Sequence, residues 1–122
     1  MKLLVCGTRV KKLPVKLIQD KLDEIKGQLD EKYLHLEIIE GCCKDSADEI
    51  AEMWAQDKGV TVHHFPSTSG NYLRRNVEMV DKCDAVLAFW NGFSYGTAHT
   101  VAQGLMKGKD VKIIEVTGYE HY

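Results

Sequence analysis

The sequence lacks a long apolar run, has little proline and carries almost balanced charge. Its longest wholly apolar stretch, residues 85–90, is far too short to cross a bilayer, and residues 1–8 do not form an extended apolar segment with a cleavage site. We therefore expect a cytoplasmic protein without membrane contact. The 16 basic and 18 acidic side chains give a net charge of −2, which disfavours duplex nucleic acid as a partner because binding it usually requires a strongly basic face.

Cysteine motifs are absent as well. The four cysteines show no C-x-x-C spacing, and the chain neighbours Cys42 and Cys43 could form a disulfide with each other only under strain. We expect reduced thiols. His63 and His64 are adjacent on an expected strand, so their side chains point to opposite faces of it. This arrangement predicts no metal site, and we expect no bound cofactor.

What the sequence does have is a regular alternation of strand and helix patterns. Its 122 residues, 44% hydrophobic and 28% charged, fit a single domain over residues 1–122 with one core. Helical spacing is clearest where Ala47, Ile50, Ala51 and Trp54 recur on one face, which places Trp54 in the core. Five strands are expected at residues 2–6, 36–40, 60–65, 85–89 and 111–116, with a helix in each interval.

This alternation predicts an α/β fold, because parallel strands need right-handed crossovers that helices span. We predict three layers around a five-stranded parallel sheet. The first and fourth strands are the most continuously apolar and belong at the centre, whereas the third strand alternates and belongs at an edge. The strand order 3-2-1-4-5 follows. Ligands of such sheets bind outside the carboxyl ends of the strands where the order reverses, here between the first and fourth strands.

Three glycine-containing loops meet at this point, with the sequences CGTRV, EGCCKDSAD and NGFSYGTAHT. The second and third lead into helices, whose first-turn N–H groups are unpaired and lie at the positive end of the helix dipole. Glycine lets a ligand approach the backbone closely, and Ser94 and Thr97 could donate to phosphate oxygens. These features favour a phosphate-bearing ligand. In the alternative interpretation the glycines only form turns and Ser94 only caps its helix.

The same loops resemble a known family. Four blocks, CGTR, GCCKDSADEIAEMWAQDKGV, RRNVEMVDKCDAVLAFW and GFSYGTAHTVAQGLMKG, are similar in order and spacing to the SLOG superfamily, particularly its YspA-type branch. The likeness spans Leu3 to about Ile114. It implies a Rossmann-like domain that binds nucleotides or nucleotide-derived ligands, with the LONELY GUY phosphoribohydrolases and the DNA-processing protein DprA among its relatives.

The resemblance also implies the ligand-binding residues. Carried over by position, they lie in the first loop, the second loop, an Arg-Asn pair and the last loop: Gly7, Thr8, Arg9, Gly41, Ser46, Asp48, Arg75, Asn76, Gly92, Ser94, Gly96 and Thr97. The second loop contains less glycine than is usual in relatives, which weakens its expected phosphate contact. Aromatic side chains near a base could come from Trp90, Phe93 or Tyr95, and Trp90 could equally face the core.

One departure from the resemblance bears on catalysis. The phosphoribohydrolases carry a glutamate where this chain has Thr100, and a carboxylate is the usual stabiliser or base when an N-glycosidic bond breaks. We therefore expect binding of a nucleotide or nucleotide-derived ligand, for sensing, delivery or sequestration. The alternative is an N-glycosidic hydrolase or deoxyribosyltransferase acting on nucleoside monophosphates, with Asp48 or Glu49 as the carboxylate and His99 as an acid.

Two further points stay open in the sequence. By analogy with DprA the chain could bind single-stranded nucleic acid, although its acidic balance counts against backbone binding. An assembly of identical chains is also open.

Overall fold

Strands and helices alternate along the chain as the sequence predicts. The computed structural model describes residues 1–8, 14–67 and 70–116, and in this part of the chain the sheet is five-stranded and parallel, in the order β3-β2-β1-β4-β5. The elements are β1 (Lys2–Gly7), α1 (Val15–Glu31), β2 (Glu37–Glu40), α2 (Ala47–Lys58), β3 (Thr61–His64), α3 (Tyr72–Lys82), β4 (Ala85–Trp90), α4 (Tyr95–Met106) and β5 (Asp110–Glu115). The predicted α/β class and strand order are confirmed.

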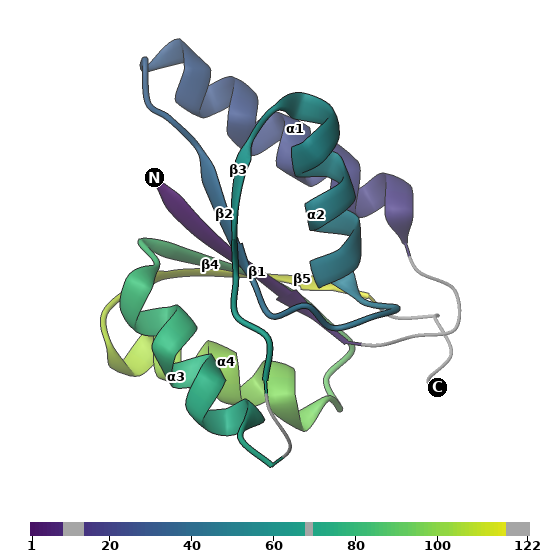
Figure 1. Ribbon diagram of the computed structural model, residues 1–122, viewed down its shortest axis with the longest axis vertical. Coiled ribbons are helices and arrows are strands. Elements are labelled where there is room, and N and C mark those ends of the chain that lie inside the picture. The colour runs from purple at the N-terminus through teal and green to yellow at the C-terminus, as the bar shows by residue number, and fades with distance from the viewer. Residues whose placement is uncertain (9–13, 68–69, 117–122) are drawn as a thin grey trace.

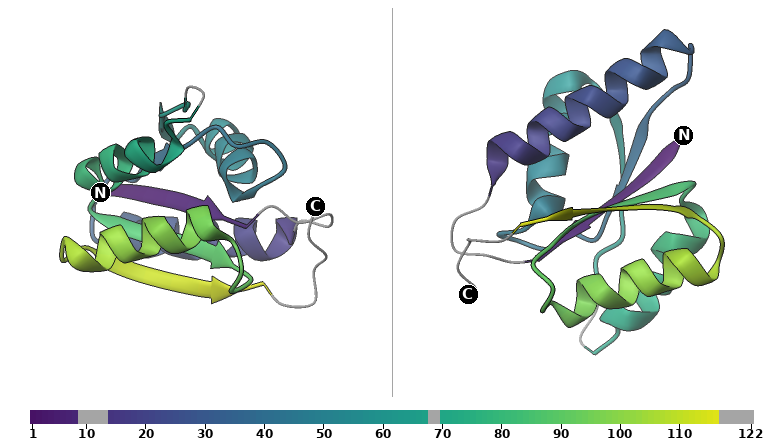
Figure 2. Two further views of the ribbon diagram at one scale, coloured as in Figure 1. Left: turned by 90° about the horizontal axis from the view of Figure 1, so that it is seen from below. Right: turned by 180° about the vertical axis from the view of Figure 1, so that it is seen from behind.

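The helices cover the two faces of the sheet in pairs. Figure 1 shows α1 and α2 on one side of the sheet and α3 and α4 on the other, and the turned views of Figure 2 show the same three layers. The chain adds β2 and β3 on one side of β1, then returns to add β4 and β5 on the other. The reversal of strand order therefore lies between β1 and β4, which pair from Leu3 opposite Ala85 to Gly7 opposite Phe89.

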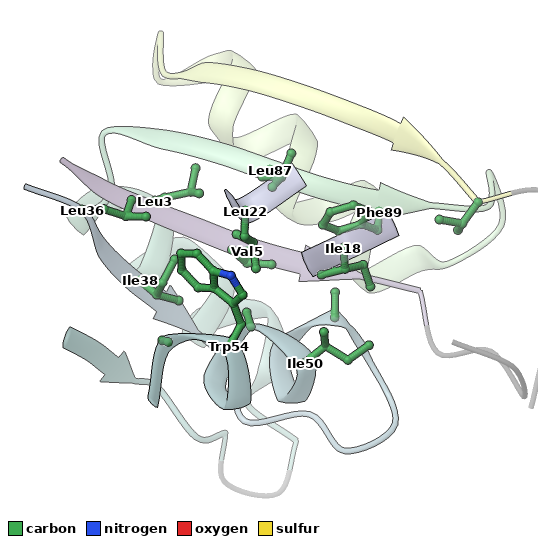
Figure 3. Close-up of a cluster of buried hydrophobic side chains, with 14 residues drawn as sticks. Leu3, Val5, Ile18, Leu22, Leu36, Ile38, Ile50, Trp54, Leu87 and Phe89 are labelled. Atoms are coloured by element: carbon green, nitrogen blue, oxygen red, sulfur yellow. The ribbon is translucent and has the colours of Figure 1, made fainter. Parts of the chain in front are cut away.

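A hydrophobic core fills the space between the sheet and α1 and α2 (Figure 3). Alternate residues of β1 and β4, such as Val5 and Phe89, meet Leu22 and Trp54 from the helices. Trp54 is 4% exposed, and its indole Nε1 donates to Asp23 Oδ1 on α1 at 2.9 Å. The prediction that Trp54 belongs to the core is confirmed, and its one polar atom is satisfied at the edge of that core.

The opposite face packs more tightly because a glycine lies between helix and sheet. A Cβ atom on Gly104 of α4 would lie 2.9 Å from Cγ2 of Val111 and 3.1 Å from Cγ2 of Val86. Contacts below 3 Å are too short for carbon atoms, so glycine lets α4 approach β4 and β5 closely. The end of α4 therefore packs directly on the amino-terminal parts of β4 and β5.

All four cysteines are free thiols, with Cys6 and Cys83 buried. None of the helices in the described part of the chain combines the length and the apolar composition that a membrane-spanning helix needs.

Candidate functional site

A cavity lies at the carboxyl end of the sheet, next to the reversal between β1 and β4. Its volume is about 320 Å³, near the lower end of the range for small-molecule sites. The lining residues come from β1, the β2–α2 loop and α2, the β3–α3 loop and α3, and the start of α4: Cys6, Gly7, Cys43, Asp48, Ser67, Tyr72, Arg75, Asn76, Met79, Ser94, Gly96, Thr97 and Thr100.

The loops after β1 and β4 are joined by hydrogen bonds. Thr8 Oγ1 donates to Asn91 Oδ1 at 3.2 Å and accepts from the Asn91 backbone N–H at 3.2 Å. The same Asn91 Oδ1 accepts from the backbone N–H groups of Phe93 and Ser94, which closes a turn ahead of α4. Trp90 Nε1 donates to the Ser94 carbonyl at 3.0 Å. Thr8 and Trp90 therefore hold the β4–α4 loop in shape, and neither lines the cavity.

The first turn of α4 presents unpaired backbone donors. Ser94 caps the helix, because its Oγ accepts from the Thr97 N–H at 3.4 Å. The N–H groups of Tyr95 and Gly96 have no acceptor among the described residues. A Cβ atom on Gly96 would meet only the Tyr72 ring, at 3.9 Å, so this glycine leaves space on the cavity side. The helix dipole adds partial positive charge at the same place.

The start of α2 differs, because an internal carboxylate already accepts from its loop. Asp48 Oδ2 accepts from the backbone N–H of Gly41 at 3.1 Å and of Cys43 at 3.3 Å. Ser46 Oγ accepts from the Asp48 N–H and donates to the Cys43 carbonyl, which caps the helix. These contacts occupy the donors that the sequence assigns to phosphate, and they give the second loop a structural function.

Burial sets the charge state of Asp48. Its side chain is 5% exposed, and desolvation raises the pKa of the carboxyl from 3.8 to about 6. This value includes the opposing effects of the neighbours: Glu40 raises the pKa, whereas the N–H groups of Cys43 and Gly41 and the charge of Arg75 lower it. The carboxylate therefore titrates at mildly acidic pH inside the cavity.

Arg75 of α3 bridges the second loop to the third. Its Nη1 donates to the carbonyl oxygens of Gly41 at 2.6 Å and Phe65 at 3.1 Å, and its Nε donates to Asn76 Oδ1 at 3.1 Å. A Cβ atom on Gly41 would lie 2.5 Å from Nη1 and 2.8 Å from Cζ of Arg75. Glycine at this position is thus needed to admit the guanidinium of Arg75, which is one of the residues that line the cavity.

Asn76 connects α3 to α4. It is 3% exposed, and its Nδ2 donates to the Gly96 carbonyl at 3.4 Å and lies 3.5 Å from Nδ1 of His99. Thr100 is buried too, and its Oγ1 donates to the Gly96 carbonyl at 3.1 Å. The Thr100 hydroxyl therefore donates within α4, to a carbonyl one turn earlier, in the cavity wall.

The structure brings most of the predicted site residues together and separates others. Seven line the cavity: Gly7, Asp48, Arg75, Asn76, Ser94, Gly96 and Thr97. Five lie near the cavity without lining it, at the end of β4 or in the surrounding loops: Thr8, Gly41, Ser46, Trp90 and Gly92. Arg9 lies outside the described residues. Gly7 is required by packing, since a Cβ atom there would lie 2.9 Å from both Ala47 Cβ and the Phe89 carbonyl oxygen.

Sequence reasoning missed several residues of the cavity wall. Tyr72 lines the cavity, whereas the exposed side chains of Phe93 and Tyr95 do not. Cys6, Cys43, Ser67 and Met79 also line it. The sequence gives little indication of Tyr72 as a cavity residue. It is the first residue of α3, so the direction of its side chain depends on how that helix packs. Cys43 could have been found from its place two residues after Gly41 in the second loop.

A larger hollow of about 430 Å³ lies away from these loops. It is bordered by α1 and by the amino-terminal parts of β1, β4 and β5, with Met1, Leu3 and Leu29 among its residues. Its position at the opposite end of the strands, and its mainly aliphatic wall, make it a poor match for a phosphate-bearing ligand.

The fold and the cavity together define a Rossmann-like domain with a ligand site at the carboxyl ends of its strands. The chain belongs to the YspA, cpYpsA-related SLOG family, whose model matches residues 1–71. This membership links the chain to the binding or processing of nucleotide-related small molecules. The match ends before α3, so Arg75 and the β4–α4 loop are assigned from their residues and geometry. No curated protein matches the sequence.

Proposed function

We propose that the protein binds a nucleotide or nucleotide-derived ligand in this cavity, with the phosphate at the start of α4. The observation that supports this most is the pair of unpaired N–H groups of Tyr95 and Gly96 at a capped helix start, where Gly96 leaves space for a ligand. Such helix starts bind phosphate because the donors and the dipole act together. The hydroxyl of Thr97 and the guanidinium of Arg75 supply further donors from the cavity wall.

The remaining wall suits the other parts of such a ligand. Asp48 offers a carboxylate, which in Rossmann-like domains is the usual partner of a ribose hydroxyl. Tyr72 offers an aromatic face at the cavity rim for a base. It takes the place of Trp90, which the sequence suggested for this contact and whose indole instead donates to the Ser94 carbonyl. A volume of about 320 Å³ limits the buried part of the ligand to roughly the size of a mononucleotide.

The proposal is tested by thermal and equilibrium unfolding with nucleoside monophosphates and the matching nucleosides. A ligand that binds only the native state adds about 2.7 kcal/mol of stability at 100 times its Kd. We expect the monophosphates to raise the melting temperature and the phosphate-free nucleosides to raise it much less. If no nucleotide in a broad panel changes the melting temperature of the protein, the proposal is wrong.

A second function has one observation in its favour. Asp48 lies in the cavity wall with a pKa of about 6, so a carboxylate is present although Thr100 replaces the expected glutamate. In this alternative the protein breaks the N-glycosidic bond of a nucleoside monophosphate, and Asp48 stabilises the oxocarbenium-like transition state. Binding without turnover is our first proposal, because Asp48 Oδ2 already accepts two backbone hydrogen bonds.

Incubation with purine and pyrimidine nucleoside monophosphates, followed by chromatography for free base, separates the two functions. Saturable binding without product supports the binding function. Release of base at a rate that Asp48→Asn abolishes would establish the enzyme instead, since a residue that contacts the ground state and the transition state equally changes affinity and not turnover.

A further inference from the structure

A second group of functional side chains lies beside the cavity, at the ends of β2 and β3. Glu40 and His64 are the last residues of these strands and are opposite each other in register. Cys42 follows in the β2–α2 loop. One ligand atom from each of the three residues lies within 4.8 Å of the others, and the separations are 2.7 Å for Glu40 Oε1 to His64 Nδ1, 3.4 Å for Cys42 Sγ to Oε1, and 3.6 Å for Sγ to Nδ1.

These separations match those of ligands around a tetrahedral metal ion. Bond lengths of about 2.3 Å to sulfur and about 2.0 Å to nitrogen and oxygen place a sulfur ligand about 3.5 Å from the other two, which in turn lie about 3.3 Å apart. Both distances from Cys42 Sγ already agree with this geometry. The Glu40–His64 pair is closer because the two atoms share a hydrogen bond, and it would open by about 0.6 Å around a metal ion.

The surroundings of the three residues also fit. His64 Nε2 lies 3.4 Å from Glu52 Oε1 on α2, and metal-binding histidines commonly donate their second ring N–H to a carboxylate. Glu40 is fully buried, and its Oε2 accepts from the Cys42 N–H at 2.7 Å, which orients the carboxylate. Cys42 and His64 are exposed, so a metal ion can enter and a water molecule can complete the coordination.

Two local costs support a ligand at this place. Glu40 is a carboxyl group without solvent exposure whose oxygens are met by His64 Nδ1 and the Cys42 N–H, and a divalent charge would compensate the burial of this carboxylate more fully. Cys42 has a backbone φ of +61°, which is unfavourable for any residue with a Cβ atom and is common at sites where function fixes the backbone. A divalent cation would offset the burial of the Glu40 carboxylate. It would also bind the Cys42 thiolate in the direction that the positive φ of this residue gives to its side chain.

We propose that Glu40, Cys42 and His64 form a three-ligand site for a divalent transition metal of the Zn²⁺ type, with Glu52 as the partner of His64. The combination of thiolate, imidazole and carboxylate favours Zn²⁺ or Co²⁺ over Mg²⁺ or Ca²⁺, which prefer oxygen ligands. On binding, the Cys42 thiol loses its proton to solvent, and His64 binds through Nδ1 as the neutral imidazole with its one ring proton on Nε2, facing Glu52. This site reverses the expectation from the sequence that the protein has no metal, and it does not depend on the proposed nucleotide function.

The experiment is titration of the full metal-free chain with Co²⁺, then competition with Zn²⁺. Thiolate coordination gives Co²⁺ a near-ultraviolet charge-transfer band, so we expect this band to saturate at one Co²⁺ per chain and to disappear when Zn²⁺ is added. Cys42→Ser should remove the band and His64→Gln should abolish saturable binding. Glu52→Gln should keep the band and weaken the affinity by about 10- to 100-fold, because it alters only the partner of the ligating ring.

The chain offers a matched control for each variant. Cys43→Ser changes the neighbouring thiol, and His63→Gln changes the neighbouring histidine, whose Nε2 lies 2.8 Å from Glu37 Oε1 and away from the three ligands. Both controls should bind Co²⁺ like the parent. Alkylation mapped by mass spectrometry gives an independent measurement, in which Zn²⁺ should protect Cys42 and not Cys43. Absence of the band in the parent, equal loss of it in Cys43→Ser, or its retention in Cys42→Ser would overturn the proposal.

Discussion

The charge of Asp48 gives the sharpest test of the site geometry. Desolvation raises the pKa of this buried carboxyl from 3.8 to about 6 in the native state. A carboxyl whose native pKa lies above its unfolded value binds its proton more tightly in the native state. It therefore contributes stability that is fully present below about pH 4 and is lost as the pH rises through about 6.

The magnitude follows from the change in pKa. A difference of about 2 pKa units corresponds to about 3 kcal/mol, and most of this falls between about pH 4 and pH 7. The neighbouring groups that influence the carboxyl are Glu40 of β2, which opposes its ionisation, and Arg75 of α3, which favours it. The Cys6 thiol of β1 is near enough for Asp48 to raise its pKa as well, so it stays neutral throughout this range.

Asp48→Asn isolates the contribution, because asparagine can accept from the same N–H groups without ionising. We expect the free energy of unfolding of the variant, relative to the parent, to rise by about 2 to 3 kcal/mol from pH 4 to pH 7 in urea titrations. Glu49→Gln changes an exposed carboxylate in the same helical turn and should follow the parent. If the difference between Asp48→Asn and the parent stays constant over this range, Asp48 is solvated and does not form the cavity wall described above.

Two further predictions use matched pairs. Gly96→Val should abolish nucleotide binding, as measured by calorimetric titration, and leave the fold intact, because a side chain there enters open space beside Tyr72. Gly104→Ala should keep the site and lower the free energy of unfolding in urea by about 1–3 kcal/mol, because the added methyl group overpacks against Val86 and Val111. A folded Gly96→Val protein with parental affinity would refute the loop assignment. Arg75→Lys should destabilise the protein by about 1–3 kcal/mol, since an ammonium cannot satisfy the Gly41 and Phe65 carbonyls and Asn76 together. Arg74→Lys, at an exposed ion pair with Glu78, should change stability by less than about 0.5 kcal/mol, and equal effects of the two substitutions would contradict the bridging function of Arg75.

The fold could be predicted from the sequence because local patterns and topology rules agree. The continuous apolar run of β4 predicts a central strand and the alternating pattern of β3 predicts an edge strand, as observed. The end of β1 lies within one residue of its expected position. The cap of α4 was visible as well, since Ser94, one of whose interpretations was a helix cap, accepts from the Thr97 N–H. These features depend on each residue's own chemistry and its nearest neighbours.

The site could be predicted only in outline, because the partners of its polar groups come from distant segments. Gly41 was assigned to ligand approach, but it makes room for Arg75, which lies 34 residues further along the chain. Trp90 could face the core or the cavity, and its indole instead donates to the loop at Ser94. The argument that His63 and His64 face apart considered one strand, whereas the side chain that His64 meets belongs to Glu40 on the next strand.

The β2–α2 loop connects the proposed metal site to the proposed ligand cavity. Cys42 lies between Gly41, which contacts both Arg75 and Asp48, and Cys43, whose N–H donates to Asp48. An ion bound by Cys42 would therefore fix the backbone that determines where Arg75 and Asp48 stand in the cavity. Because any coupling between two bound ligands is reciprocal, a metal that orders this loop for the nucleotide must itself bind more tightly when the nucleotide is present.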